Sequence, residues 1–534
     1  MKNTLEFLKR FGFIIFNVTL FIFLAVMFAR AQGVEVKNSL RLIDIDQPNK
    51  AIEFLNKAVS EHPDDAILHY YIGYAQLQAG EYDLAFESFE KGLVKNDKQP
   101  LFYVGKGHVL LLKKNTTEAK SFFDRALAMS KSKNVAVLQA IARAYLSEPK
   151  FSGEALALLE KANLIEPNNA ETYLLLGDAY LMQNNGGSAV SNYEWAAQYD
   201  PKNAKPPYKI GVVYLRTKDY KIAEESFLKA ISIDPGYARA FKELGELSYL
   251  SKNGTQAVKY YETYLLLTEK PEKDKLRYAF FLFMARDFTK ANEVFRGLVQ
   301  KEDVNPITLR YYAFSLFEAG DYQQSRGLFE KYFTNTRQEF NASDYGYYGK
   351  LLTKLNEDSL ASINLEKSLA LDKNQTELTR LLAETQLKHK KYQKSIELYK
   401  QLIGSHEKPL SQDYYSIGRA YYFNSQYANA DSSFLKLIEL QPNMVVGYLW
   451  EARTKSNLDP ESENGLAKPF YEKLIEIASI NPDKSKNDLI EAYSYLGYYH
   501  FLKEEMRLSK SYWMKVLALN PNHEKAKEAI KAIH

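Results

Sequence analysis

The chain contains no cysteine, and this absence removes several kinds of chemistry at once. A disulfide framework, a thiolate zinc site and a cysteine nucleophile all need that residue. Histidine is also sparse. The eight histidines are scattered, none lies at a metal-pairing distance from another, and HExxH is absent. We therefore expect no metal site and no bound cofactor, and we interpret the histidines as surface or packing residues.

The sequence also lacks the short motifs of common catalytic sites. There is no GxSxG and no GxxxxGK[ST], and Gly105-Lys106-Gly107 has neither the third glycine nor the preceding strand of a dinucleotide-binding loop. Carboxylates are abundant, but most lie on outer helix faces or in turns, so no acid/base pair can be singled out. These absences predict a protein that is not an enzyme.

Charge of either sign is nearly balanced, with 70 Lys+Arg against 66 Asp+Glu and a net charge of +4. A protein that coats nucleic acid needs a concentrated basic face, so we expect no nucleic-acid partner. Aromatic residues reach 14%, which is typical of a folded chain. Because 534 residues exceed what one hydrophobic core usually supports, several domains or one extended array are expected.

The first 31 residues have the composition of a secretory signal peptide. Lys2, Lys9 and Arg10 precede an apolar run over residues 11–28, and Ala29-Arg30-Ala31 is a small-x-small exit that predicts cleavage before Gln32. The run is nearly long enough to span a bilayer, so an uncleaved membrane anchor is the alternative. Both interpretations export the rest of the chain to the periplasm or cell envelope, and contact with a membrane is expected only through this segment if it is uncleaved.

The remaining sequence is periodic. A column of small residues recurs mostly every 34 positions, and a second small column runs twelve or thirteen residues ahead of it. A large residue, usually aromatic, follows the first column by four positions. The first column is Ala51, Ala85, Ala119, Ala155, Ala189, Ala223, Ala257, Ala291, Ser325, Ala361, Ser395, Ala430, Ala467 and Ser509, and its large partners include Phe89, Tyr193, Phe227, Tyr261, Phe434 and Trp513.

These columns predict two amphipathic helices in every period. Apolar residues such as Tyr173, Leu176 and Tyr180 recur at helical spacing on one stripe, and Ala189, Tyr193 and Ala196 do so on the next. Small residues on each stripe let the two helix axes approach closely. A proline often closes the period and turns the chain, as at Pro63, Pro167, Pro201, Pro235, Pro442 and Pro521.

The pattern resembles the tetratricopeptide repeat family, and residues 170–203 are similar to a consensus copy. The resemblance implies an all-α fold: a right-handed α-α superhelical solenoid of about fourteen helix-turn-helix repeats over residues 32–523. Residues 524–534 are predicted to form a C-terminal capping helix, and the first repeat an N-terminal cap. The thirteenth repeat is stretched, and residues 459–487 are predicted to hold a hinge or an added loop. No room remains for a catalytic domain.

In this family the first helices of successive repeats line a concave groove. The positions implied as groove-facing give a central apolar band and a more C-terminal basic run with aromatic residues. Alternatives stay open for both: the band is inner surface packed against itself or core misphased by one residue, and the run is a solvated face neutralised by neighbouring acids. The candidate partner-binding residues are Phe280, Phe283, Phe314 and Phe317 in the band, and Lys350, Arg380, Tyr415, Arg419, Tyr422 and Arg453 in the run.

The predicted function is a non-enzymatic scaffold of the cell envelope. It would bind peptide segments or helices of partner proteins in its groove, in the assembly or secretion of envelope complexes. The Lys/Asn/Asn/Lys/Arg set with which chaperone-binding members of the family grip two carboxylates is missing. Three alternatives stay open: a membrane-anchored assembly factor, a regulatory subunit of an envelope enzyme, and a glycan-binding protein. The sequence leaves the oligomeric state open.

Overall fold

The structure is a computed structural model that describes residues 35–269, 271–300, 304–334, 339–405 and 409–533. The signal peptide or anchor predicted for residues 1–31 lies outside these ranges. No described helix combines the length and apolar character that a membrane span requires. Helices make up 78% of the residues that the structure describes, and these residues contain no strand, which confirms the all-α prediction.

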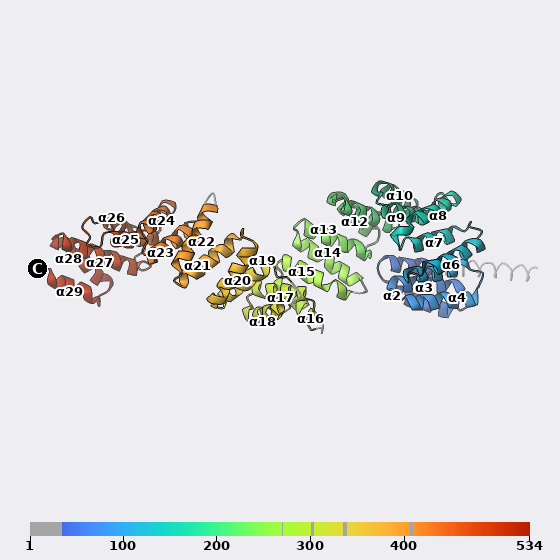
Figure 1. Ribbon diagram of the computed structural model, residues 1–534, viewed down its shortest axis with the longest axis horizontal. Helices are drawn as coiled ribbons and strands as arrows, with labels where there is room; N and C mark the ends of the chain where they lie inside the picture. Colours follow the sequence, from blue (N-terminus) through green and yellow to red (C-terminus); the bar gives the residue numbers. More distant parts are fainter. Residues whose placement is uncertain (1–34, 270, 301–303, 335–338, 406–408, 534) are drawn as a thin grey trace, which may run out of the picture. The chain divides into compact units, whose positions relative to one another are not determined.

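The chain divides into two compact units, an N-terminal unit that ends at Lys301 and a C-terminal unit that begins at Glu302 (Figure 1). Counting helical residues 35–44 as a first helix, the described helices form fourteen consecutive pairs and one final helix. The N-terminal unit contains α2 (Pro48–Glu61), α3 (Ala66–Ala79), α4 (Tyr82–Lys95), α5 (Pro100–Leu112), α6 (Thr116–Met129), α7 (Val135–Tyr145), η1 (Pro149–Phe151), α8 (Ser152–Ile165), α9 (Ala170–Met182), α10 (Gly186–Tyr199), α11 (Lys205–Arg216), α12 (Tyr220–Ile233), α13 (Ala238–Leu250), α14 (Gly254–Leu267), η2 (Pro271–Lys273), α15 (Lys275–Met284) and α16 (Phe288–Leu298).

The C-terminal unit has the same alternation of first and second helices. It contains α17 (Pro306–Glu318), α18 (Tyr322–Phe333), α19 (Ala342–Lys354), α20 (Asp358–Leu371), α21 (Thr376–Lys388), α22 (Tyr392–Ser405), α23 (Ser411–Phe423), α24 (Tyr427–Leu440), α25 (Val445–Leu458), α26 (Lys468–Ala478), α27 (Lys486–Leu502), α28 (Met506–Leu519) and α29 (Glu524–Ala532). The last helix packs against α28 through Trp513, Val516 and Ala526.

The turn inside each pair is encoded locally. The residue that leaves the first helix adopts a left-handed backbone, as at Lys218 (φ 63°), and glycine takes this place at Gly80 and Gly320. In six pairs the next residue is an Asn or Asp whose side chain caps the second helix. Asp219, for example, accepts the backbone N–H of Ile222 at 3.3 Å. In most pairs the first helix therefore ends and the second begins within a few residues, whereas longer connections join α7 to α8 and α25 to α26.

The two columns of the sequence meet inside each pair. A Cβ atom added to Gly211 would lie 2.5 Å from the ring of Phe227, and one added to Gly177 would lie 2.4 Å from the ring of Tyr193. Phe227 and Tyr193 are fully buried. The small residue of the first helix thus accommodates the large residue of the second, which confirms the predicted register.

First helices lie close to the next first helices along the chain. Contacts join α3 with α5, α7 with α9, α19 with α21 and α23 with α25, whereas successive second helices of the described part contact one another more weakly. First helices therefore line the inner side of each curved array, as the resemblance implies.

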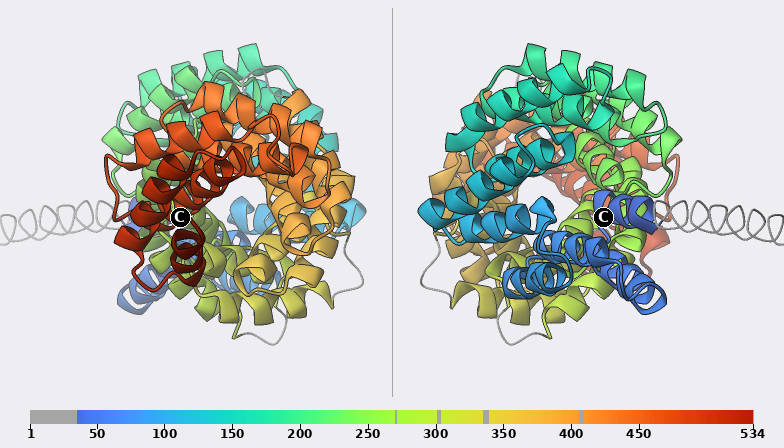
Figure 2. Two further views of the ribbon diagram at one scale, coloured as in Figure 1. Left: turned by 90° about the vertical axis from the view of Figure 1, so that its left-hand side faces the viewer. Right: turned by 90° about the vertical axis from the view of Figure 1, so that its right-hand side faces the viewer.

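The N-terminal unit contains long-range contacts that the periodic pattern did not predict. Residues 41–50, here called the N-terminal strap, lie against α11–α14, about 160–220 residues later in the chain (Figures 1 and 2). Arg41 donates to both oxygens of Asp234 at 2.9 and 2.7 Å, and Gln47 donates to the carbonyl of Leu267 at 2.7 Å. The first repeat therefore does more than cover one end, because it closes the curve of its own unit.

Apolar and capping contacts complete the attachment of the strap. The Ile45 side chain is buried in a cluster that includes Phe227, Ala240 and Leu244. The carboxylate of Glu269 accepts the backbone N–H groups of Asn49 and Lys50 at 2.9 and 2.7 Å, at the start of α2. A negative charge at a helix N-terminus also interacts favourably with the helix dipole.

The extra sequence of the thirteenth repeat forms an ordered loop. The buried carboxylate of Asp459 accepts backbone N–H groups of Asn464 at 3.1 Å and Leu466 at 3.2 Å. These bonds lower the pKa of Asp459 against the opposing effect of burial. Of the two predicted options, the added loop is observed here, and the division between the two compact units lies elsewhere, at residues 301/302.

One carboxyl group of the C-terminal unit is completely buried. Glu451 on α25 is 0% exposed and lies 3.6 Å from the Nζ atom of Lys455, which also contacts Asp431 on α24 at 2.6 Å. Burial and the neighbouring Asp431 raise the pKa of Glu451 to about 9, whereas Lys455 opposes the shift. The folded protein therefore holds a proton on this group near neutral pH.

We expect Gly211→Leu to destabilise the N-terminal unit by about 1–3 kcal/mol or more, because the new side chain would overlap the ring of Phe227. The matched control is Gly187→Leu, since nothing lies within 4 Å of a Cβ atom added at that exposed helical glycine. Thermal unfolding followed by circular dichroism compares the two variants. Equal melting temperatures would contradict the assigned register.

We expect Glu451→Gln to make the stability of the C-terminal unit less dependent on pH. Between its ordinary pKa of 4.5 and about 9, the folded protein holds a proton on Glu451 that the unfolded chain releases, so stability falls as pH rises through this window. The variant should be more stable than the wild type at pH 8, by at least about 1 kcal/mol, and nearly equal at pH 4. Glu439→Gln, at an exposed position on α24, is the control for melting scans at both pH values. A parallel pH dependence in wild type and variant would show that Glu451 is ionised.

Candidate functional site

The four phenylalanines of the predicted apolar band are divided between the two units. Phe280 and Phe283 lie on α15 of the N-terminal unit, whereas Phe314 and Phe317 lie on α17 of the C-terminal unit. Phe280 packs edge-on against Tyr249 at 5.5 Å between ring centroids. Phe283 contacts Phe288 at 5.9 Å. In each unit these rings have aromatic neighbours from their own array.

Phe314 belongs to the core, which corrects its assignment to an open groove surface. It is 3% exposed, and its ring stacks on Tyr347 at 4.0 Å and contacts Phe329 at 5.7 Å. The physical reason is that residues 312–316 of α17 are all buried, so more than one face of this helix is covered. Phe317 remains partly exposed and meets the same Tyr347 ring edge-on. These contacts favour self-packing over a docking band.

Three cations of the predicted basic run are already paired. Both oxygens of Asp413 accept from Arg380, at 2.7 and 3.1 Å, and both oxygens of Glu491 accept from Arg453, at 2.7 and 2.6 Å. These hydrogen bonds raise the pKa values of both arginines above the ordinary value. Lys350 pairs with Glu377 at 2.9 Å. The carboxylates come from the first helix of the next repeat, so the alternative of a neutralised face applies to these three residues.

Arg419 is different from the arginines on either side of it. It lies on α23, and the described part of the chain offers it no carboxylate within ion-pair distance. Its Nε atom is buried without a hydrogen-bond partner. The guanidinium instead lies over three aromatic rings, 5.4 Å from Tyr415, 5.9 Å from Phe423 and 5.5 Å from Trp450. We call these residues together with Tyr422 the Arg419 cluster.

The remaining contacts hold the Arg419 cluster in place. Tyr422 meets Trp450 edge-on at 5.3 Å, and its hydroxyl accepts a hydrogen bond from Asn457 at 3.1 Å. Phe423 is 42% exposed. The cluster therefore presents guanidinium donors beside flat apolar surface. The structure brings together the predicted Tyr415, Arg419 and Tyr422, whereas Trp450 was missed because its position was not among those implied as groove-facing.

The N-terminal unit contains two inner cavities that the sequence analysis did not select. Their volumes are about 280 and 440 Å³, and they share the side chains of Tyr74, Arg143 and Lys205. Asp44 of the strap and Leu40, which directly precedes the strap, line the smaller cavity. The sequence does contain basic and aromatic residues at first-helix positions of repeats two to six. Because these residues are spread over several repeats, no single repeat pointed to a cavity.

Ion pairs surround these cavities. Arg143 donates to Glu171 at 2.6 Å, and Lys205 donates to Asp44 of the strap at 2.8 Å. Burial alone would lower the pKa of Arg143, but Tyr74 and Glu171 raise it above its ordinary value. Burial, followed by the charge of Arg143, lowers the pKa of His108 to about 4, so this histidine is neutral near pH 7.

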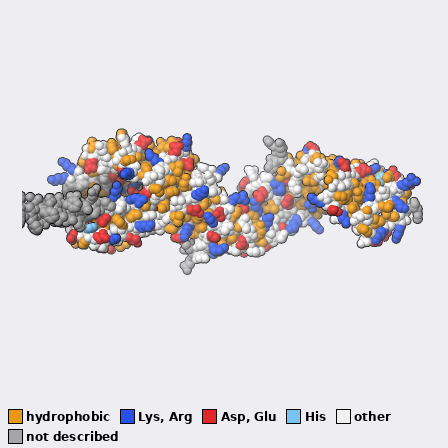
Figure 3. Space-filling view, turned by 180° about the vertical axis from the view of Figure 1, so that it is seen from behind, with side chains coloured by type: hydrophobic (Ala, Val, Ile, Leu, Met, Phe, Trp, Pro, Cys, Tyr) orange, Lys and Arg blue, Asp and Glu red, His pale blue; other side chains and the backbone are white. Residues whose placement is uncertain are grey.

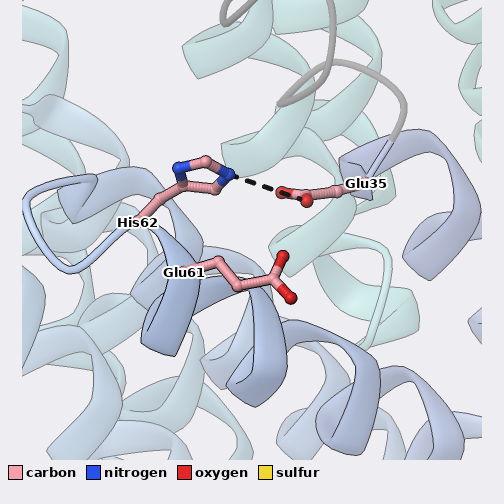
Figure 4. A group of neighbouring side chains, drawn as sticks. All are labelled: Glu35, Glu61 and His62. Atoms are coloured by element: carbon pink, nitrogen blue, oxygen red, sulfur yellow. Dashed lines mark ion pairs between the residues drawn. The ribbon is translucent and has the colours of Figure 1, made fainter.

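One other group of side chains could offer ligands to a cation. Glu35, Glu61 and His62 each present one ligand atom, and these atoms lie within 4.8 Å of one another (Figure 4). His62 and Glu35 already form an ion pair at 3.9 Å, and Glu61 is exposed. We therefore describe the group as an ion-pair cluster near the first repeat.

On the face drawn in Figure 3, acidic and basic side chains are interspersed over both units.

Comparison with known proteins connects this arrangement to a family. Family models described as tetratricopeptide repeat match residues 38–100 and 174–238 in one case, and residues 101–133 and 414–444 in another. No curated protein matches the chain.

Several solved structures are similar to parts of the chain. The C-terminal part of a TPR repeat-containing protein from Cytophaga hutchinsonii is 33% identical, covering 48% of this chain and 99% of that one, with a TM-score of 0.42. YrrB, described as a TPR protein with an unusual peptide-binding site, is 25% identical over 35% of this chain and 95% of its own, with a TM-score of 0.23. A thermophilic TPR protein from Thermus thermophilus is 18% identical over 33% of this chain and 98% of its own, with a TM-score of 0.29.

The family models, the identity to the Cytophaga protein and the consecutive helix pairs agree with one another. The small and aromatic columns that define the register of the repeat occupy the interior of each pair. The chain therefore belongs to the tetratricopeptide repeat family.

Proposed function

We propose that this protein is a non-enzymatic scaffold of the cell envelope that binds acidic segments of partner proteins on the inner face of its C-terminal unit. Membership of the repeat family supports the binding of protein partners in general. The observation that supports acidic segments as the bound partners is the Arg419 cluster. In this cluster a guanidinium without a carboxylate partner in the described residues lies among aromatic rings.

The chemistry of the Arg419 cluster suits a carboxylate-bearing segment. An arginine can grip a carboxylate through paired hydrogen bonds, and its neighbours Arg380 and Arg453 form such pairs with residues of the chain itself. Arg419 retains this capacity for a partner. The exposed Phe423 and the rings of Tyr415 and Trp450 add flat apolar contact next to the charge. Arginine and aromatic residues together often dominate the energy of an interface.

The envelope location and the export of the chain rest on its first 31 residues, which have a basic start, an apolar run and a small-x-small exit. In this proposal the cleaved protein acts in the periplasm in the assembly or secretion of envelope complexes. The membrane-anchored form differs only in retaining that segment.

We expect Arg419→Glu to weaken partner binding at least tenfold, because attraction to an acidic segment becomes repulsion. Binding is measured by recovery of partners from envelope extract on immobilised protein, and then by titration of the recovered partner at two salt concentrations. The wild type should bind less tightly at high salt, and the variant should show little of this dependence.

Arg507→Glu is the matched control, since Arg507 is an exposed arginine on α28, a second helix of the same unit. It should leave binding unchanged, and both variants should keep wild-type helix content. If Arg419→Glu and Arg507→Glu bind alike, the Arg419 cluster is not the docking site, and the basic run is only a solvated face.

We expect the exported protein to begin at Gln32. Intact-mass measurement of the protein from the periplasmic fraction checks the cleavage site directly. Recovery of the full-length chain in the membrane fraction would instead favour the anchored alternative. Full-length protein that stays in the cytosol would contradict export in either form.

A further inference from the structure

The two inner cavities of the N-terminal unit are distinct from the Arg419 cluster, which lies in the other unit. We propose that these cavities form a binding site for a small organic carboxylate, with Arg143 as its principal contact. Three features carry the proposal: the size of the cavities, two lining polar side chains that have no hydrogen-bond partner in the described residues, and the charge of the lining.

The size of the cavities suits a small ligand. The strap is held on α11–α14 by the Arg41–Asp234 pair and the Gln47 hydrogen bond, and its Ile45 side chain is buried. Asp44 of the strap lines the smaller cavity, whereas no strap residue lines the larger one. The cavity volumes of about 280 and 440 Å³ are of the size that small ligands occupy.

Two deeply buried polar side chains face this space without hydrogen-bond partners in the described part of the chain. Tyr70 is 7% exposed and lines the smaller cavity, and His108 is 8% exposed and lines the larger one. Both also border a narrow gap next to Arg143. The polar atoms of these two side chains are not enclosed by the protein, so both are available to a ligand in the cavities. Arg143 itself makes one hydrogen bond to Glu171, although a guanidinium has five N–H donors.

The charge of the larger cavity favours a monoanion. Five basic side chains line it (Arg143, Lys205, Lys209, Arg216 and Arg239), together with one acidic side chain, Asp178. Four of these cations pair with the carboxylates of Glu171, Asp44, Asp178 and Asp46. Arg216 has no ion pair in the described residues, so one positive charge is in excess. A single carboxylate neutralises that charge, and its planar shape matches the fork of a guanidinium.

The rest of the lining accepts an apolar body. The smaller cavity is bordered by Tyr71, Leu101 and Ala136 in addition to Tyr70, and Tyr74 stands between the two cavities. The guanidinium of Arg143 lies 5.5 Å from the centre of the Tyr74 ring. A carboxylate at Arg143 and His108 would therefore place a short aliphatic or aromatic group against tyrosine and leucine side chains.

The test is calorimetric titration of the full chain with acetate, butyrate and phenylacetate, each compared with its neutral amide. We expect at least one acid to bind with a Kd of about 1 mM or lower, and its amide to bind at least tenfold more weakly. No binding by any of the acids up to about 10 mM would overturn the proposal. Equal binding of acid and amide would overturn the role of the charge.

Substitutions locate the site. Arg143→Gln combined with Glu171→Gln removes the central cation without leaving a buried charge unpaired, and we expect at least a tenfold loss of affinity for the acid. The control is Lys113→Gln with Asp83→Asn, a pair on the outer surface, which should bind as the wild type does. His108→Phe should weaken binding several-fold without lowering the melting temperature, because it replaces an unpartnered polar group by an apolar one.

The result of the titration with organic acids is independent of the function proposed for the C-terminal unit. Arg419→Glu should leave binding of the acid unchanged. Undiminished affinity in the Arg143/Glu171 double variant would place the acid elsewhere and overturn the assignment. Loss of affinity in Arg419→Glu as well would show that the acid reports on the Arg419 cluster, and this too would overturn it.

Discussion

The fold depends on one repeated contact, the approach of a small residue on the first helix to a large side chain, usually an aromatic ring, on the second helix of the same pair. At Gly211 the space for a side chain is already filled by Phe227, and at Gly418 it is filled by Phe434. Interiors are close-packed, so this contact fixes the distance between the two helices as well as burying the ring. Each pair then offers the same outer surfaces to its neighbours, and the array can continue.

Stacking of equal pairs leaves one surface without a fixed partner, the inner face lined by first helices. The two units treat this face differently. In the N-terminal unit the strap folds back over α11–α14, and its Asp44 and Asp46 carboxylates meet Lys205 and Arg239 at the edge of the inner cavities. In the C-terminal unit the described inner face carries Arg419 and Phe423, which keep exposed surface. The inner cavities of the N-terminal unit suit small ligands, whereas the exposed inner face of the C-terminal unit suits extended segments of a partner.

The amino-acid sequence predicts the parts of this structure that depend on near neighbours. Columns at a spacing of 34 identify the helix pairs, the turns and the packing of Gly211 on Phe227. The strap is not predictable in this way, because Arg41 and Asp234 are 193 residues apart and a periodic pattern carries no information about such distances. The candidate site was predicted in part. Tyr415, Arg419 and Tyr422 do meet, but the sequence pattern did not show that Arg380 and Arg453 pair with Asp413 and Glu491 of the next repeat.

The paired arginines explain why Arg419 is informative. Arg310 with Asp344, Arg380 with Asp413 and Arg453 with Glu491 each join the first helices of neighbouring repeats. A partly buried ion pair contributes little net stability, because desolvation offsets the attraction, whereas removing one partner is costly. These pairs therefore act mainly on geometry and fix how neighbouring first helices are placed. Arg419 lies in the same environment but contacts aromatic rings instead of a carboxylate. It is therefore not needed to place the neighbouring helices, and its N–H donors are left for a partner.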